Sequence, residues 1–464
     1  MQGAAETSPY KLLNLHPTAW AASEVAVYRG EVATTARPDH VPIALTDSGR
    51  HYRSHRSLVA STGALAASTI PQRHGHTHRS QKTQTSIRPR TVKITSRLRW
   101  PLVHRDQLTD VLANAASPEH TVVVEQKVVN LALQGGGSHG AFTWGVLDRL
   151  LEEERLGFEG ITASSAGSVN AAVLAHGLAV GGRDEARRAL QRFWKRMSET
   201  TAHGMLQPSL LDRVKGKFGL EHSPGYLFVD ALMYFTSPHF FNPLNHNPVR
   251  NLLEEIVDFE RLRQKSAVKL FLCATNVRTG KAKVFKAGEI SVDHVLASTC
   301  LPLLMQAVEI DGEVYWDGGF SGNPVVYPLV YECEARDVVM VHLTPAERPE
   351  IPSDSHAIMN RMQEISFNSG LIREMRAVTF VNKRIDEGKM ADGKLMLIHV
   401  IEAEDVIREF PGSSRLNNSW DFLCHLYELG RERTGKWLTA NFDHLGKEST
   451  VDLEAKYFLI HLTQ

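Results

Sequence analysis

The sequence predicts an α/β fold in which a mostly parallel sheet lies between helices, and three observations carry this prediction. An apolar strand at 128–133 runs through a glycine-rich loop into an amphipathic helix. A second β-compatible segment, 157–163, passes through a serine-containing turn into an apolar helix over 168–178. Further strands are predicted at 267–277, 336–345 and 394–405. Long apolar strands of this kind are typical of parallel sheets that are covered on both faces.

The N-terminal part of the 464-residue chain differs in composition from the rest. Residues 1–110 contain 15 Lys and Arg residues against 7 Asp and Glu residues, although the whole chain has a formal net charge of zero. Because this part also lacks a sustained periodicity, we expect 1–125 to be a basic, largely disordered extension. Its alternating histidines, His74, His76 and His78, are more typical of a solvated tract than of a metal site. Contact with anionic lipid headgroups and a dispensable tail both stay open as roles.

Three consecutive glycines, Gly135 to Gly137, follow the first predicted strand, and Gly140 lies at the start of the helix. Uncovered N–H groups beside a helix N-terminus can bind an anion, either the pyrophosphate of a dinucleotide or the oxyanion of acyl transfer. A dinucleotide site needs an acidic residue at the end of the next strand. Glu159 is spaced correctly but lies near the start of that strand, and Ser165 occupies its end. The spacing therefore favours the oxyanion hole.

Ser165 lies in a turn between strand and helix and is surrounded by small residues, namely Ala163, Ala166 and Gly167. This arrangement is typical of a nucleophile elbow, in which bulky neighbours would collide with the backbone. The G-x-S-x-G pattern usually opens with glycine, and here that residue is Ala163. Ser164 and Ser168 leave the register ambiguous, although Ser168 is expected to cap the helix.

Asp317, Gly318 and Gly319 follow a short β-like segment at 314–316. A serine nucleophile needs a base, and a carboxylate on a glycine turn can take the proton directly. The same Asp-Gly sequence is also typical of a plain hairpin turn. In combination with the glycine loop and Ser165, the interpretation of Asp317 as a base is favoured.

In these motifs and their order the chain resembles the patatin-like phospholipases: GGGSHG at 135–140, ASSAG at 163–167 and DGG at 317–319. The phrases at 240–253, 297–304 and 310–319 are similar as well. The resemblance implies a patatin-like three-layer α/β/α fold with an elbow serine. It also implies a catalytic domain over 130–330, with 331–464 as a C-terminal α/β completion. Two residues depart from the family pattern, Ala163 in place of Gly and His139 in place of Arg or Lys.

The function implied by this resemblance is that of a lipid acyl hydrolase, of phospholipase A or lysophospholipase type, with a Ser–Asp dyad and an acyl-enzyme intermediate. The implied site residues are Ser165 as nucleophile, Asp317 as proton acceptor, Gly135, Gly136, Gly137 and Gly140 as the oxyanion hole, Ala163, Ala166 and Gly167 as elbow support, and Gly318 and Gly319 as the turn after the base. Neither a metal nor another cofactor is expected. A hydrolase or transferase for another hydrophobic ester, such as a storage polyester or thioester, stays open, and so does a nucleotide-binding protein that uses the glycine loop.

The expected partner is a lipid or another hydrophobic ester, and no contact with nucleic acid is expected. No apolar run reaches the roughly 18 residues of a membrane-spanning helix, and the N-terminus lacks a charged-then-apolar signal pattern. We therefore expect a cytoplasmic protein whose membrane contact, if any, is peripheral. The sequence leaves the oligomeric state open.

Two further segments are expected to surround the site. The aromatic segment 201–244 is predicted to form a cap and an acyl-chain groove over Ser165. Its candidate lining residues are Phe218, Phe228, Tyr234, Phe235, Phe240 and Phe241. A long amphipathic helix is predicted after residue 354, with Ile358, Met362, Ile365, Ile372 and Met375 on the face that packs against the sheet.

Overall fold

The computed structural model describes residues 126–202, 204–209, 211–212 and 218–458 of the chain. The predicted basic extension over 1–125, including its three alternating histidines, lies outside the described residues. The same is true of the last residues of the predicted C-terminal part, 459–464.

An eight-stranded sheet forms the centre of the described part, with the strand order β5-β6-β3-β2-β1-β7-β8 and with β4 paired to β3. The strands are β1 (Lys127–Leu133), β2 (Leu156–Ser164), β3 (Lys269–Asn276), β4 (Ala282–Lys286), β5 (Val308–Ile310), β6 (Glu313–Asp317), β7 (Asp337–His342) and β8 (Leu397–Glu402). Five neighbouring strands are parallel to one another, in the order β3-β2-β1-β7-β8. The strands β4 and β6 pair antiparallel with β3, and β5 pairs antiparallel with β6. The predicted mostly parallel sheet is confirmed, and strands lie at all three of the further predicted positions.

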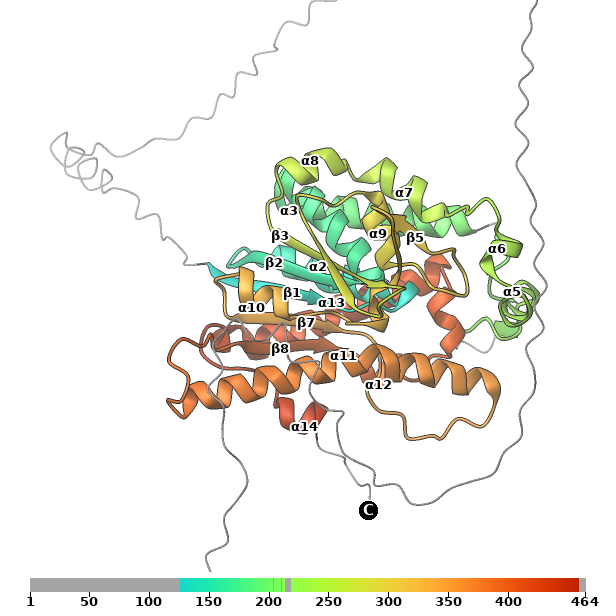
Figure 1. Ribbon diagram of the computed structural model, residues 1–464. Coiled ribbons are helices and arrows are strands. Elements are labelled where there is room, and N and C mark those ends of the chain that lie inside the picture. The colour runs from blue at the N-terminus through green and yellow to red at the C-terminus, as the bar shows by residue number, and fades with distance from the viewer. Residues whose placement is uncertain (1–125, 203, 210, 213–217, 459–464) are drawn as a thin grey trace, which may run out of the picture. The chain divides into compact units, whose positions relative to one another are not determined.

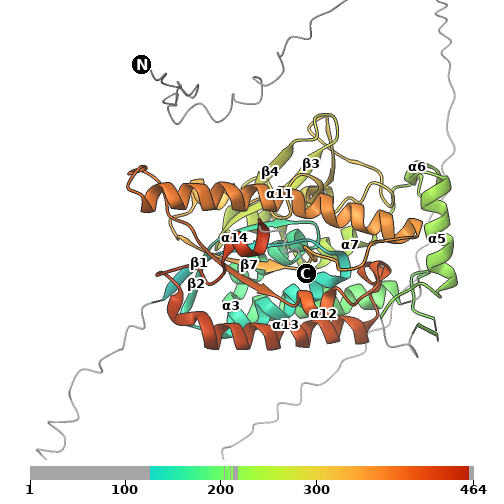
Figure 2. The same ribbon diagram turned by 90° about the horizontal axis from the view of Figure 1, so that it is seen from below.

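Helices cover both faces of this sheet, because successive strand residues point to opposite sides. In β1, Leu131 and Leu133 pack into one apolar core, whereas Ala132 packs into the other. The first core is shared with α2 (Gly140–Glu152), α3 (Ala166–Thr201) and α13 (Trp420–Asn441). The second is shared with α11 (Ser355–Asp386) and α14 (Leu453–Tyr457). The fold is thus a three-layer α/β/α sandwich, and Figure 2 shows the sheet between α11 and α13.

Shorter helices lie around these three layers (Figure 1). They are α5 (Pro224–Phe235), α6 (Pro238–Phe241), α7 (Pro248–Ile256), α8 (Phe259–Gln264), α9 (Val292–Ser298), α10 (Tyr327–Glu332) and α12 (Glu404–Ile407). Four 3-10 turns complete the described part: η2 (Gly137–His139), η3 (Gly318–Phe320), η4 (Gly412–Leu416) and η5 (Phe442–His444). None of the described helices is long and apolar enough to cross a membrane.

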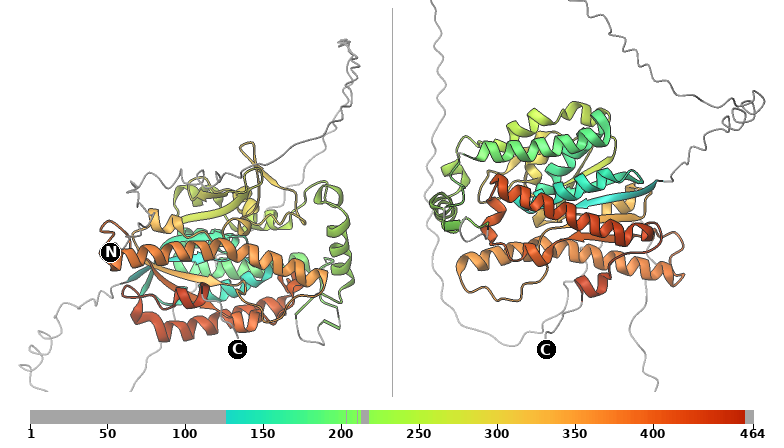
Figure 3. Two further views of the ribbon diagram at one scale, coloured as in Figure 1. Left: turned by 60° about the horizontal axis from the view of Figure 1, so that its bottom comes forward. Right: turned by 180° about the vertical axis from the view of Figure 1, so that it is seen from behind.

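The helix α13, which is the long red helix in both views of Figure 3, is bound closely to α2. Trp144 of α2 stacks on Tyr427 of α13, with 4.1 Å between the ring centroids. The buried carboxylate of Asp148 on α2 accepts hydrogen bonds from Tyr427 Oη at 3.0 Å and from Arg187 Nε of α3 at 2.8 Å, and it also pairs with Arg431 of α13. These contacts hold α13 against α2, the helix that follows the glycine loop.

The long helix predicted after residue 354 is α11, but only part of it packs as expected. Ile372 and Met375 contact the second core, as predicted. Ile358, Met362 and Ile365 do not, and they are 42 %, 59 % and 54 % exposed. The N-terminal half of α11 extends past the sheet towards α5 (Figure 2), so its apolar side chains have no strand to cover. The prediction that Ile358, Met362 and Ile365 pack against the sheet is therefore wrong.

Candidate active site

Ser165 lies at the sharp turn between β2, which ends at Ser164, and α3, which begins at Ala166. Its backbone angles are φ 55° and ψ −131°, a conformation that is unfavourable for a residue with a side chain. Its N–H is held by the carbonyl oxygen of Ser298 at 3.2 Å and by Ser298 Oγ at 3.1 Å. This turn presents the Ser165 hydroxyl at the carboxyl end of a parallel strand, where open α/β sheets place their sites.

The three serines of the turn differ in what their hydroxyl groups contact. Ser165 lines a large cavity. Ser164 Oγ is buried and donates to the Gly322 carbonyl at 2.6 Å. Ser168 was predicted to cap α3, but this prediction is wrong. It lies inside the helix, and its Oγ bonds to Ser298 Oγ at 2.8 Å. Of the three, Ser165 is therefore the serine that lines the cavity.

The glycine loop passes directly over Ser165. A Cβ atom at Gly135 would lie 2.3 Å from Ser165 Cβ, so only glycine permits this approach. The Gly135 N–H donates to Asn323 Oδ1 at 2.7 Å, and the Gly140 N–H bonds to the carbonyl groups of the preceding turn. Gly136 and Gly137 line the same cavity as Ser165. Of the four predicted donors, Gly135 and Gly140 therefore have N–H groups bonded within the protein, whereas Gly136 and Gly137 lie at the cavity.

Asp317 lies at the end of β6, which pairs with β3, and its side chain is fully buried. Its Oδ1 accepts the Gly319 N–H at 2.7 Å, so the glycine turn after it orients the carboxylate. Burial raises the pKa of Asp317 to about 7, while the Ser165 hydroxyl and the Gly319 N–H act to lower it. Oδ2 is buried without a partner at ordinary hydrogen-bond geometry. The Ser165 hydroxyl acts on this carboxylate as a hydrogen-bonding group, so the structure brings Asp317 beside Ser165.

A serine beside a buried carboxylate of nearly neutral pKa can perform general-base chemistry. In free enzymes such hydrogen bonds are often long and tighten only when substrate binds. A carboxylate whose pKa is close to the operating pH combines a sufficient ionised fraction with useful basicity. The two N–H groups of Gly136 and Gly137 can stabilise an oxyanion formed on an attacked carbonyl. The arrangement therefore fits acyl transfer.

Residues 131–330 match the family model described as patatin-like phospholipase. The segment is patatin-like. This confirms the resemblance carried by the three motifs, and the match contains the glycine loop, Ser165 and Asp317.

Two solved structures are distantly similar to this chain. The search of curated protein sequences found no match. Among solved structures, VipD from Legionella pneumophila is 14 % identical, with 71 % of this chain and 73 % of that chain covered and a TM-score of 0.35. The complex of ExoU with SpcU from Pseudomonas aeruginosa is 15 % identical, with 69 % of this chain and 53 % of that chain covered and a TM-score of 0.28. The chain thus spans about half the length of the chain it matches in that complex.

The cavity at Ser165 has a volume of about 910 Å³ and is built from several elements of the patatin-like segment and the C-terminal part. One wall is apolar and includes Phe193, Trp194 and Met197 of α3 together with Met233 of α5. Pockets of this size and composition bind drug-sized or lipid-like molecules. The wall can therefore accommodate an acyl chain.

Five of the six aromatic residues predicted to line this cavity have described side chains, and none of these five lines it. Phe228, Phe235 and Phe240 are exposed, and Phe235 is 87 % exposed. Phe218 instead stacks on Phe422 of α13, with 4.8 Å between the ring centroids. Phe241 is not among the lining residues, and the Tyr234 side chain lies outside what the structure describes. The segment 201–244 does border the cavity, but through Leu206, Tyr226, Asp230 and Met233.

The two departures from the patatin-like pattern are both accommodated by burial. The Ala163 methyl group is fully buried in the first core. His139 is buried beside Phe410 and Phe422, and its Nε2 lies 2.8 Å from Ser414 Oγ. Burial first, and then the charges of Arg415 and Arg348, lower the pKa of His139 to about 3. His139 is therefore neutral near pH 7 and supplies no positive charge to the glycine loop.

Sequence reasoning missed several residues that hold the site together, because their roles depend on distant contacts. Ser298 fixes the elbow, and Asn323 fixes Gly135. Gln134 Oε1 accepts the N–H groups of Leu343 and Thr344 at 2.6 Å and 2.7 Å. Ser298 lies in the family-like phrase 297–304 and Asn323 lies four residues after Gly319, and this proximity is the signal that could have found them.

The C-terminal part contributes directly to the glycine loop through η4. The Arg415 carbonyl oxygen would lie 2.3 Å from a Cβ atom at Gly137, and Ser138 Oγ donates to Asn418 Oδ1 at 2.8 Å. These residues lie beyond the segment matched by the family model, so no motif indicated them.

Glu159, the acidic residue of the dinucleotide alternative, lies away from this cavity. It accepts hydrogen bonds from the N–H groups of Glu334 and Ala335 and pairs with Lys269 at 2.8 Å. These contacts account for its carboxylate, and it does not line the cavity with the glycine loop. This placement gives no support to a ribose-binding role.

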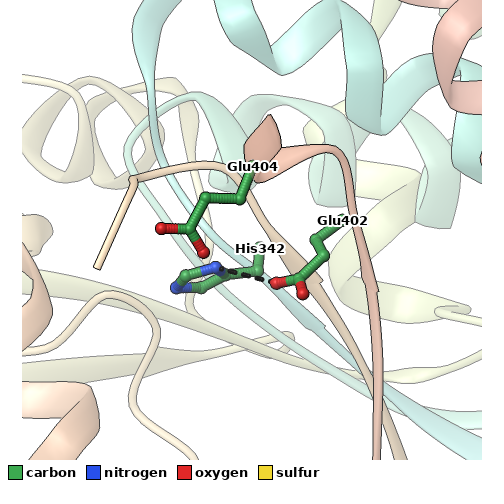
Figure 4. Close-up of side chains that lie close together, drawn as sticks. All are labelled: His342, Glu402 and Glu404. Atoms are coloured by element: carbon green, nitrogen blue, oxygen red, sulfur yellow. Dashed lines mark ion pairs between the residues drawn. The ribbon is translucent and has the colours of Figure 1, made fainter. Parts of the chain in front are cut away.

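His342, Glu402 and Glu404 form a compact group whose donor atoms could hold a metal ion (Figure 4). His342 Nδ1 lies 3.4 Å from Glu402 Oε2. A cation is already present here, because Lys456 Nζ lies 2.7 Å and 2.6 Å from the two Glu402 oxygens and 3.9 Å from Glu404. Although burial acts to raise the pKa of Glu402, His342 and Lys456 hold it at about 2. The group is therefore an ion pair within the fold.

Replacing Gly137 with alanine is expected to lower kcat/KM for ester hydrolysis about 100-fold, the effect of losing one oxyanion donor. Gly137 has φ +61°, and a Cβ atom there would collide with the Arg415 carbonyl, so the loop must move. Steady-state kinetics with a short-chain ester measure the loss. Gly280→Ala is the matched control, because Gly280 has φ +68° but no atom within 4 Å of an added Cβ. Equal activity of the two variants would contradict the role of this loop.

Proposed function

We propose that the protein is a lipid acyl hydrolase that cleaves carboxylic esters, of phospholipase A or lysophospholipase type, through Ser165 and Asp317. The observation that carries this proposal is the buried Asp317 carboxylate, with a pKa raised to about 7, beside the cavity-facing hydroxyl of Ser165. The match of residues 131–330 to the patatin-like phospholipases supports the same chemistry.

In the proposed reaction, Ser165 Oγ attacks the ester carbonyl while Asp317 accepts its proton. The N–H groups of Gly136 and Gly137 stabilise the negative charge on the carbonyl oxygen. The alcohol leaves with the proton returned by Asp317, and the acyl group stays on Ser165. Water then attacks this ester with Asp317 again as base, which releases the fatty acid and restores the serine.

We also propose that the functional unit is larger than the predicted catalytic domain over 130–330, with 331–464 completing it. Support comes from β7, which pairs with β1 next to the glycine loop, and from η4, which contacts Gly137. A protein cut after residue 330 would lose both contacts.

Product analysis with the purified full chain tests the proposed substrate class. The protein is incubated separately with a phospholipid, a lysophospholipid, a monoacylglycerol and an acyl thioester of one chain length, and the products are identified by mass spectrometry. We expect free fatty acid from the phosphate-containing lipids and, at a lower rate, from the monoacylglycerol. Release from the thioester alone, or acyl transfer without free acid, would support the alternative of another hydrophobic ester. No acyl cleavage of any substrate would contradict the proposed function.

A further inference from the structure

Three arginines surround one buried carboxylate at the wall of the Ser165 cavity. Glu364 of α11 is bound by Arg348 at 2.8 Å, by Arg361 at 3.2 Å and by Arg415 at 2.7 Å. Its own side chain is 2 % exposed. Three guanidinium groups against one carboxylate leave two positive charges uncompensated within this cluster. Such an excess favours binding of an anion.

Arg415 is the member of this cluster that lines the cavity with Ser165. Its backbone lies against Gly137, and its Nη2 reaches Glu364 on α11. The side chain therefore extends along the cavity wall from the glycine loop to α11. Neither Arg348 nor Arg361 lines the cavity.

The Arg415 guanidinium has hydrogen-bonding capacity to spare. Within the described residues it donates one hydrogen bond, to Glu364 Oε1. By contrast, Arg348 also donates to the Arg408 carbonyl and Arg361 to the Ala346 carbonyl. The Arg415 side chain is 16 % exposed and lines the cavity, so its remaining N–H groups are within reach of a ligand there. A guanidinium with free N–H groups is well suited to bind phosphate oxygens.

The other charged groups near this wall do not neutralise Arg415. Asp230, the acidic residue among those lining the cavity, lies 3.3 Å from His356 Nε2. Glu221 accepts the Ser413 hydroxyl at 2.6 Å and forms no ion pair with Arg415 in the part of the chain that the structure describes. His139 is neutral near pH 7.

From this geometry, which rests on the proposed function, we infer that Arg415 binds the phosphate of a phosphate-containing lipid while the acyl ester lies at Ser165. The apolar wall of α3 takes the acyl chain, and the part of the wall at η4, where Arg415 lies, takes the headgroup. Arg415 is thus a substrate-binding residue that distinguishes phospholipids from neutral esters.

Kinetics of Arg415→Gln on matched substrates test this inference. The substrates are a lysophospholipid and a monoacylglycerol with the same short acyl chain, each below its micelle concentration. We expect kcat/KM for the lysophospholipid to fall about 10- to 100-fold, the effect of losing hydrogen bonds to a charged group, and that for the monoacylglycerol to change less than about twofold. Arg415→Lys keeps the charge and should recover part of the loss.

Arg361→Gln is the matched control, because it removes an arginine from the same Glu364 carboxylate without altering the cavity wall. In each single variant Glu364 keeps two arginine partners, so both proteins should fold. A selective loss with Arg415→Gln alone supports the inference. An equal loss on both substrates, no loss, or the same selectivity in Arg361→Gln overturns it.

Inorganic phosphate distinguishes a lipid headgroup from a free anion as the ligand. If the site binds a headgroup, phosphate should raise KM for the lysophospholipid in the unaltered protein and leave the monoacylglycerol reaction unchanged. An equal effect on both substrates would assign the site to the free anion and overturn the inference. If the unaltered protein cleaves neither lipid, the proposed function fails instead.

Discussion

Ser165→Ala is expected to lower kcat/KM for ester hydrolysis by about 10⁴-fold or more, because the attacking atom is lost and only binding and the oxyanion donors remain. Ser165 combines the elbow geometry with a hydroxyl at the cavity, next to Asp317. Rates with a chromogenic short-chain ester measure the loss, and the melting temperature shows that the fold is kept.

The neighbouring serines provide the controls for this variant. Ser164→Ala and Ser168→Ala each remove a buried hydroxyl that bonds within the protein. We expect them to lower stability by about 1 kcal/mol while activity stays within about tenfold of the unaltered protein. If Ser165→Ala stays active and either neighbour is inactive, the nucleophile has been assigned to the wrong serine.

Asp317→Asn is expected to abolish activity to a similar extent, because the amide cannot accept the serine proton. In the unaltered protein, kcat/KM should fall tenfold per pH unit below an apparent pKa near 7, since only ionised Asp317 acts as base. The pH dependence of kcat/KM for an uncharged ester measures this. A flat profile between pH 5.5 and 8 would contradict the role of Asp317.

Asp317→Asn should lose activity without losing thermal stability at neutral or higher pH. The folded-state pKa of Asp317 lies above its usual value of 3.8, so the folded protein binds an additional proton between about pH 4 and 7. The protonated Asp317 carboxyl therefore stabilises the folded protein at low pH. This stabilisation is lost as the pH rises through about 7 and the buried group becomes charged. Asparagine removes the buried charge, and the melting temperature of Asp317→Asn at pH 8 should be no lower than that of the unaltered protein. A large drop would indicate a structural role for the carboxylate.

The motifs around Ser165 could be predicted from sequence because their requirements are local. A tight turn needs small neighbours, and a loop that passes over Ser165 needs glycine at residue 135. The strands β1, β3, β7 and β8 are apolar along most of their length because both faces are covered, and this pattern is readable directly. The fold class and the meeting of the three motifs followed from these features.

The cavity walls could not be predicted because they depend on how distant segments pack. Phe235 and Phe240 were expected to be lining residues on hydrophobicity alone, yet they are exposed. Arg415 follows Ser165 by 250 positions, and only packing of η4 on the glycine loop brings it to the cavity. His139 could be recognised as a departure from the family pattern, but its sequence context gave no indication of the arginine cluster at Glu364.

Site-resolved covalent labelling tests the central claim most directly. The purified protein is treated with a fluorophosphonate, which reacts with activated serines, and the modified residue is identified by peptide mass spectrometry. We predict one phosphonate adduct, on Ser165, formed in step with loss of esterase activity and absent from Ser165→Ala. Labelling should be much slower in Asp317→Asn. Complete inactivation with Ser165 unmodified, or an adduct on another serine, would contradict the claim.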